Sequence, residues 1–237
     1  MTERQLELHD NYMRVLEKIE RAKARRTVNK DREVTLLAAT KTVAAEDIVF
    51  LAEECGLRLC GENHVQEFTA KYDAVTATGA RMDLIGHLQT NKVKYVAGRA
   101  GLIHSVDSLR LAEELDRRCA RLGTKQRILI EINIGMEESK TGIAPSEFER
   151  FAEEISGLTS IELCGMMTMA PKCTENDEFR KYFRESCGIF LDFFAKKTHN
   201  IGEPVLSMGM SDSYECAIEE GSTMVRVGSA IFGSRHT

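Results

Sequence analysis

Eight short apolar runs, separated by longer stretches, constrain the fold of this 237-residue chain more than any other feature. The runs are Val34–Ala39, Leu57–Cys60, Met82–Ile85, Leu102–Val106, Ile128–Ile134, Ile161–Met166, Val205–Ser207 and Met224–Val227. Short continuous apolar runs are typical of strands that are buried on both faces. Strands that alternate with helices pair in parallel through right-handed crossovers. The pattern therefore predicts an α/β protein with a parallel sheet.

The stretches between the runs carry apolar residues at helical spacing. The clearest are Ala45–Cys55, Ser108–Leu122, Ser146–Ser156 and Asn176–Lys196. Polar residues with the character of helix starts are Thr40, Asp107, Ser108, Ser146 and Ser213, and glycines that could end helices are Gly56, Gly123 and Gly157. Eight βα units that close on themselves give a single (β/α)8 TIM barrel. Because the second, seventh and eighth runs are very short, a doubly wound open sheet is the alternative.

A helix precedes the barrel in this interpretation. The segment from Glu3 to about Ala24 has apolar residues at helical spacing with charged residues between them. No linker rich in Pro, Gly or Ser divides the chain, so we predict one domain over residues 1–237. Its N-terminal helical extension lies in 1–26 and its barrel in 33–233. After the eighth run and the short turn that follows it, only Ile231–Thr237 remain, so we expect no C-terminal β domain.

Charge and cysteine usage exclude several function classes. The formal net charge of -5 gives no general attraction to nucleic acid, and no stretch approaches the roughly 20 apolar residues of a membrane helix. The chain begins with polar and charged residues, unlike a signal peptide. Its seven cysteines are scattered and lack C-x-x-C spacing, which indicates neither a disulfide framework nor a zinc site. We expect a cytoplasmic protein without a metal.

Polar residues follow nearly every predicted strand, where a barrel places its chemistry. Lys41 follows Thr40 at the end of the first apolar run. A lysine in a partly desolvated cavity has its ammonium form disfavoured, which suits it to imine formation with an aldehyde. The alternative is a solvated lysine at a strand–loop junction.

The last two strands end in small residues that suit a phosphate site. Ser207 closes the seventh run, and Gly228 and Ser229 follow the eighth. Barrels commonly bind phosphate in these two loops through backbone N–H groups and hydroxyls, although Gly and Ser also simply form turns. Arg226 lies inside the eighth run, where it faces either a polar cavity or the helix layer. His87 follows the third run and could orient a ligand, although a structural role is the simpler interpretation.

Six ordered motifs run through almost the whole chain. They are Ala38–Thr42, Gly61–Glu67, Ile85–Lys92, Leu163–Met169, Leu206–Asp212 and Val225–Gly233. On these motifs the chain resembles the pyridoxal-phosphate homeostasis protein family, small relatives of the alanine racemase barrel. The resemblance implies the barrel called fold type III among pyridoxal phosphate (PLP) proteins, and PLP as the cofactor.

The resemblance also implies roles for residues on the ring side of the cofactor. Lys41 would carry pyridoxal 5'-phosphate as an internal aldimine. Asn63 and Met166 would lie against the ring region, with His87 nearby. His64 stands where a tyrosine is expected in the family, which puts one ring-side contact in doubt.

The resemblance further implies that Ser207, Gly228 and Ser229 hold the phosphate and that Arg226 faces the pyridine nitrogen. A carboxylate at that nitrogen favours its protonation and so stabilises a carbanion, whereas a cationic arginine disfavours it. Ser213 replaces a second aspartate of the family pattern, which puts the capping of this loop in doubt.

These implications favour a cytosolic PLP-binding protein of intracellular PLP homeostasis that carries the cofactor as a lysine Schiff base without substantial catalysis. The related racemases use a second base, a tyrosine, supplied with the help of an additional β domain. The alternatives are a PLP-dependent enzyme acting on small amino acids, such as a residual racemase, and a Schiff-base barrel aldolase. The expected partners are PLP and apo PLP-dependent enzymes, with neither nucleic acid nor membrane, and we expect a monomer.

Overall fold

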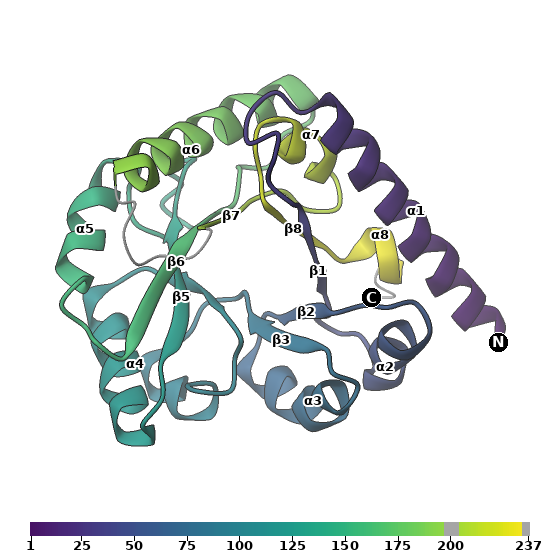
Figure 1. Cartoon of the computed structure of the whole chain (residues 1–237), viewed down its shortest axis with the longest axis horizontal. Coiled ribbons are helices and arrows are strands. Elements are labelled where there is room, and N and C mark those ends of the chain that lie inside the picture. The colour runs from purple at the N-terminus through teal and green to yellow at the C-terminus, as the bar shows by residue number, and fades with distance from the viewer. Residues whose placement is uncertain (197–203, 234–237) are drawn as a thin grey trace.

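The eight strands of the computed structural model, which describes residues 1–196 and 204–233, close into one parallel barrel (Figure 1). They are β1 (Thr35–Ala39), β2 (Leu59–Glu62), β3 (Arg81–Leu84), β4 (Ile103–Val106), β5 (Gln126–Ile132), β6 (Ile161–Thr168), β7 (Val205–Ser207) and β8 (Met224–Val227). Each strand pairs with its neighbour in sequence, and β8 pairs with β1 with Arg226 opposite Leu37. This closure confirms the predicted (β/α)8 barrel, and the open-sheet alternative is wrong.

The helices surround the barrel. They are α1 (Glu3–Arg25), α2 (Ala45–Glu54), α3 (Val65–Ala77), α4 (Leu109–Leu122), α5 (Phe148–Ile155), α6 (Asn176–Lys196), α7 (Tyr214–Glu219) and α8 (Ser229–Phe232), with short 3-10 helices at Thr90–Tyr95 and Pro145–Glu147. The four stretches predicted to be helical all contain helices. Helix α3 was not singled out by its sequence, because its buried face includes Lys71 and so interrupts the apolar period.

Helix α1 belongs to the ring of helices. It begins with a capping box of Thr2 and Gln5, and its apolar face, from Leu8 to Ala22, is buried. It packs against α7, α8 and α2, so it supplies the helical cover that the four-residue α8 is too short to give (Figure 1). Arg4 fastens its start to the Asp47 carboxylate on α2 and to the Phe232 carbonyl on α8.

Two apolar layers hold the barrel together. The larger lies between strands and helices, and the smaller is drawn almost entirely from strands and fills the barrel interior. The buried members of the interior layer are Leu37, Leu59, Leu102, Leu129, Cys164, Met167 and Met224. Burial of the two layers together provides the main driving force for folding of the barrel.

A β-bulge at Gly165 decides which methionine of β6 faces inward. Ile128 and Ile130 of β5 pair with Leu163 and Met166 of β6, so β6 has one more residue than β5 between the two pairs. Gly165 has φ +146, a conformation that residues with a Cβ rarely adopt. The bulge reverses the alternation of the strand, and Met167, not Met166, joins the interior layer.

The expected helix starts are only partly correct. Thr40 does not cap α2, whose N-cap is Ala44, because the Thr40 hydroxyl is buried and donates to Glu62 Oε1 at 2.7 Å. Ser146 lies inside a 3-10 helix, whereas Ser108 is the N-cap of α4. Ser213 is the N-cap of α7 by position, but its side chain makes no capping bond to the helix; its Oγ accepts the Met210 N–H of the preceding loop at 3.2 Å.

All seven cysteines are free thiols. None of the described helices combines the length and apolar character needed to cross a membrane.

Candidate functional site

A cavity of about 590 Å³ opens at the carboxyl ends of the strands. Its described lining comes from the loops after β1, β2, β3, β6, β7 and β8, together with the start of α1. The lining residues are Arg4, Ala39, Lys41, Thr42, Val43, Ala44, Asp47, Asn63, Ile85, Met169, Met210, Ser211, Asp212, Arg226, Gly228, Ser229, Phe232 and Gly233. This volume lies in the range that encloses a small-molecule ligand or cofactor. The barrel thus has a cavity with charged and polar side chains in its lining at the strand ends, where the sequence predicts a site.

Five of the eight predicted site residues line this cavity: Lys41, Asn63, Arg226, Gly228 and Ser229. Lys41 is half-buried and lies two residues beyond the end of β1. Gly228 and Ser229 follow β8 directly. Because β1 and β8 are paired, an amine and a glycine-containing turn come from adjacent strand ends.

Arg226 points into the barrel and forms the floor of the cavity. It lies on the same face of β8 as the interior residue Met224, and it is only 5% exposed. Its Nη1 donates to Ser207 Oγ at 2.7 Å and its Nη2 to the Thr168 carbonyl at 2.9 Å. Burial lowers the pKa of Arg226 to about 10, and the Glu131 charge opposes this shift. The guanidinium therefore remains a cation at neutral pH, and the alternative orientation into the helix layer is wrong.

A buried polar chain supports Arg226 from below. Ser207 Oγ lies 3.3 Å from His104 Nδ1, and His104 Nε2 lies 3.2 Å from Asp83 Oδ2. Burial lowers the pKa of His104, against the opposing effect of Asp83, so the imidazole is neutral. Burial raises the pKa of Glu131 on β5. The floor is therefore a hydrogen-bonded network that fixes one cation in place.

Asn63 brings an unsatisfied acceptor to the site. Its Oδ1 is buried without a hydrogen-bond partner among the described residues. Buried amide oxygens are almost always paired in folded proteins, so an orphan beside a cavity indicates a missing ligand group. Gly86 allows this placement, because a Cβ there would collide with the Asn63 backbone.

The turn after β8 is held by a hydroxyl from the neighbouring loop. Ser211 Oγ accepts the Gly228 N–H at 3.1 Å and the Ala230 N–H at 3.3 Å. A Cβ on Gly228 would stand 3.0 Å from the Ala39 carbonyl oxygen, so the turn packs tightly against β1. The loop and turn together place the serines Ser211 and Ser229 at one corner of the cavity.

The structure does not bring Met166, His87 or Ser207 to the cavity lining. Met166 faces the helix layer because of the Gly165 bulge. The half-exposed His87 side chain is turned toward Asp107, with 3.8 Å between Nδ1 and Oδ2. Ser207 is fully buried below the cavity as the partner of Arg226, because the last residue of β7 faces the barrel interior.

Sequence reasoning missed other lining residues. Ser211 and Asp212 line the cavity and lie in the Leu206–Asp212 motif, from which sequence reasoning predicts only Ser207 as a phosphate ligand. Met169 follows β6 where Met166 was expected to act. Arg4 is contributed by the first turn of α1, and no local pattern indicates that it reaches the barrel mouth.

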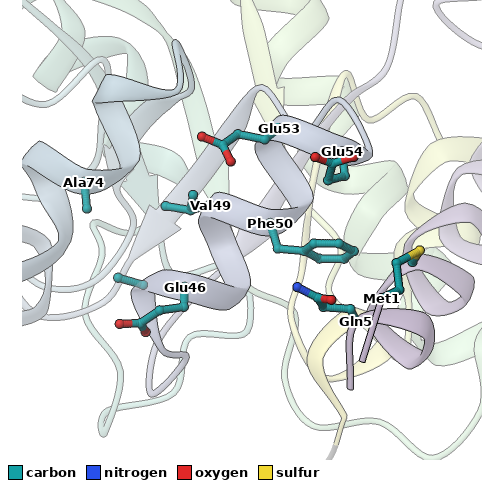
Figure 2. Close-up of a pocket in the computed structure, with 9 residues that line it drawn as sticks. Met1, Gln5, Glu46, Val49, Phe50, Glu53, Glu54 and Ala74 are labelled. Carbon is teal, nitrogen blue, oxygen red and sulfur yellow. The ribbon is translucent and has the colours of Figure 1, made fainter. Parts of the chain in front are cut away.

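A second cavity of about 520 Å³ lies in the outer helix layer (Figure 2). It is bordered by the start of α1, by α2 and by Ala74 of α3. Three glutamates of α2 and the Phe50 ring line it, and none of the predicted site residues reaches it. Its position away from the strand ends makes the barrel-mouth cavity the candidate site.

The barrel with a lysine after β1 and an arginine in the floor defines a class, the barrels of the alanine racemase N-terminal domain. The family described as "Alanine racemase, N-terminal domain" matches residues 16–236 of this chain. An alanine racemase from Clostridium difficile superposes with a TM-score of 0.70 at 16% identity, covering 96% of this chain and 60% of that one, which shows the shared fold alone.

Two relatives narrow the class to a family. The chain is 40% identical to the pyridoxal phosphate homeostasis protein of Aquifex aeolicus over 222 residues, covering 94% of this chain and 96% of the relative. The PipY protein of Synechococcus elongatus, whose structure has PLP bound, superposes with a TM-score of 0.75 at 31% identity, covering 84% and 92% of the two chains. The chain belongs to the pyridoxal phosphate homeostasis protein family.

Proposed function

We propose that this chain binds pyridoxal 5'-phosphate at the barrel mouth, as a Schiff base on Lys41, and serves PLP homeostasis without substantial catalysis. The observation that carries the proposal is the convergence of an amine, a buried guanidinium and a phosphate-type turn on one cavity. The names of the relatives and the PLP-bound PipY structure support it.

The residues present suit the chemical parts of this cofactor. When bound, PLP supplies an aldehyde that can condense with a lysine amine and a pyridine ring that can act as an electron sink. Lys41 would provide the amine. Asn63 would offer its orphan amide oxygen to a hydrogen-bond donor of the ligand. Arg226 would face the ring nitrogen as a hydrogen-bond donor.

We propose that Ser211, Gly228 and Ser229 hold the phosphate. Ser211 is placed where its hydroxyl already gathers the N–H groups of the turn after β8. Phosphate oxygens accept such donors strongly, and the turn is close enough to β1 for the ligand to reach Lys41. Ser207 is left out of this set because its side chain is fully buried below the cavity lining, where it accepts from Arg226, whereas Ser211 lines the cavity.

Two features support carriage over turnover. Arg226 stays cationic at neutral pH, and a cation at the ring nitrogen disfavours its protonation and weakens the electron sink. Of the described lining residues, none is a tyrosine, histidine or cysteine, and the carboxylates are Asp47, which pairs with Arg4, and Asp212. Racemisation needs an acid or base on each face of the substrate, and the described lining offers no evident partner for Lys41.

The absorbance spectrum of the purified protein with PLP tests the proposal. We expect a yellow Schiff-base band that is lost in Lys41→Ala and kept in Lys94→Ala, a control at an exposed lysine. Borohydride reduction followed by peptide mapping should place the cofactor on Lys41. A colourless protein would refute the binding site, and Lys41-dependent racemisation of amino acids would refute the absence of catalysis.

We further propose apo PLP-dependent enzymes as the recipients, a monomeric state and a cytosolic location. The seven free thiols fit a reducing compartment. Transfer is measured by mixing PLP-loaded protein with an apo-enzyme and following the return of that enzyme's activity, with Lys41→Ala as the control. Sedimentation of the loaded protein measures the oligomeric state.

A further inference from the structure

The turn that carries Lys41 is strained, and something must hold it. Thr42 has φ +63, in the left-handed region that a β-branched residue rarely enters. Such a conformation persists only where the surrounding structure fixes it, and strained backbone of this kind gathers at functional sites. Because Thr42 is the next residue after Lys41, whatever fixes its backbone also fixes the origin of the Lys41 side chain.

Three side chains from the next βα unit make the contacts that hold this turn. Lys71 Nζ donates to the Thr40 carbonyl at 2.9 Å, and the Thr40 hydroxyl donates to Glu62 Oε1 at 2.7 Å. Glu67 Oε2 accepts the Thr42 N–H at 2.7 Å. The residues on both sides of Lys41 are therefore tied to the same group of charges.

The three charges are also tied to one another. Lys71 Nζ lies 2.8 Å from Glu62 Oε1 and 3.0 Å from Glu67 Oε2, so its three donors match three acceptors, the third being the Thr40 carbonyl. Burial would raise the pKa of Glu67, but the Thr42 N–H and the Lys71 ammonium outweigh it and lower that pKa. Glu67 is therefore ionised and holds the turn as an anion.

Stability alone does not account for this cluster. Glu62 is fully buried, and its Oε2 lacks a hydrogen-bond partner among the described residues. A buried ion pair is often no more stabilising than apolar residues of similar volume, and an orphaned carboxylate oxygen adds a cost. The cluster instead coincides with the one turn that leads to Lys41, while Asn63, next to Glu62 in sequence, lines the cavity.

We propose that Glu62, Glu67 and Lys71 form a positioning triad that fixes the Thr40–Thr42 backbone and thereby aims Lys41 into the cavity. The inference rests on the proposed function only for what Lys41 then binds. It gives the Gly61–Glu67 motif two purposes, since Asn63 faces the ligand and the two glutamates face the Lys41 turn.

The test compares Glu67→Ala and Glu67→Gln with Asp116→Ala. Asp116 is a matched control, because it too is a half-buried helical carboxylate that accepts one loop N–H, that of Ser160 at 2.6 Å. Two readouts are taken from each protein. Hydrogen exchange reports the protection of the 40–43 segment without any ligand, and borohydride trapping with mass spectrometry reports how fast PLP reacts at Lys41.

We expect exchange in the 40–43 segment to rise about 10- to 100-fold in Glu67→Ala, as the loss of a charge-assisted hydrogen bond implies. Trapping at Lys41 should slow by about tenfold or more. Glu67→Gln, which keeps an oxygen acceptor, should lie between Glu67→Ala and the wild type. Asp116→Ala should match the wild type in both readouts.

Unchanged exchange and trapping in Glu67→Ala would overturn the proposal, as would an equal slowing of trapping in Asp116→Ala. If the wild-type protein traps no PLP at Lys41, the proposed function fails, and the exchange result alone decides whether the triad positions the turn. Glu67→Gln keeps the comparison decisive if Glu67→Ala does not fold.

Discussion

Ser207→Ala should lower the free energy of unfolding, mainly because buried Arg226 loses a hydrogen-bond acceptor. The substitution removes the acceptor of Arg226 Nη1 at 2.7 Å and the hydroxyl beside His104 Nδ1 at 3.3 Å. Both partners are buried, so the alanine variant leaves their polar atoms poorly solvated. A hydrogen bond to a charged group contributes about 1.5–3 kcal/mol, and a neutral one about 0.5–1.5 kcal/mol. We therefore expect a loss of about 2–4 kcal/mol in the free energy of unfolding.

Urea unfolding measures this loss, and Ser186→Ala is the matched control. Ser186 is equally buried, but its hydroxyl meets only neutral partners, the Tyr182 carbonyl at 2.8 Å and the Thr168 hydroxyl at 3.2 Å. Its loss should cost about 1 kcal/mol. In a thermal scan the Ser207→Ala change corresponds to a fall in Tm of about 5–15 °C for a chain of this size.

The same pair of variants distinguishes two roles for Ser207. If Ser207 held the ligand phosphate directly, Ser207→Ala would weaken PLP binding and cost no more stability than Ser186→Ala. That result would refute the assignment of Ser207 to the floor of the cavity. A large loss of stability, with PLP binding weakened only through the loosened Arg226, is the outcome that the structure implies.

Three further predictions concern protonation, the bulge and thiol reactivity. Because burial lowers the pKa of His104 from its usual 6.5, the unfolded chain takes up a proton first as the pH falls, and stability should drop below pH 6.5 by up to about 1.4 kcal/mol per pH unit. Urea titrations at several pH values should show that this contribution is absent in His104→Gln. Gly165→Ala should lower the free energy of unfolding by about 2–4 kcal/mol, because an alanine there must adopt φ +146 and its Cβ would collide with the Val205 carbonyl. Gly79→Ala, at φ +83 with open space around it, should lower it by about 1 kcal/mol. Urea unfolding measures both. Burial raises the pKa of Cys60 to about 12, so iodoacetamide at pH 8 should label it only after unfolding, as peptide mapping would show.

The barrel was predictable because its strands are buried on both faces and leave an apolar run of their own. The observed strands begin and end within two residues of the predicted runs. One of the larger differences is at β5, which begins and ends two residues before the predicted run Ile128–Ile134. The helices were harder where their buried face is mixed. In α3 the buried positions include Lys71, whose partners Glu62 and Thr40 lie on other elements, so its burial depends on tertiary contacts.

Within the site, sequence predicted the loops better than the individual atoms. Lys41, Asn63 and Gly228 could be placed because each lies within two residues of the end of a strand. The position of Met166 could not be predicted, because the Gly165 bulge shifts the alternation of inward and outward side chains in β6 by one residue. Sequence reasoning missed Ser211 because its contact with the turn after β8 depends on how the loop after β7 folds. The order of residues does not show that the Ser211 hydroxyl accepts the Gly228 N–H.

The place of α1 in the ring of helices sets the order in which the chain can complete its fold during synthesis. Helix α1 is synthesised before α7 and α8, against which it packs, and β1 cannot pair with its second neighbour until β8 has been synthesised. Contacts of such long sequence separation form slowly, because the intervening loop must close before they stabilise anything. The apolar face of α1 therefore lacks its α7 and α8 contacts until nearly the whole described chain has left the ribosome. Nascent chains truncated before Met224 should be the species that chaperones hold, and the closed barrel should form in a late step that joins both ends.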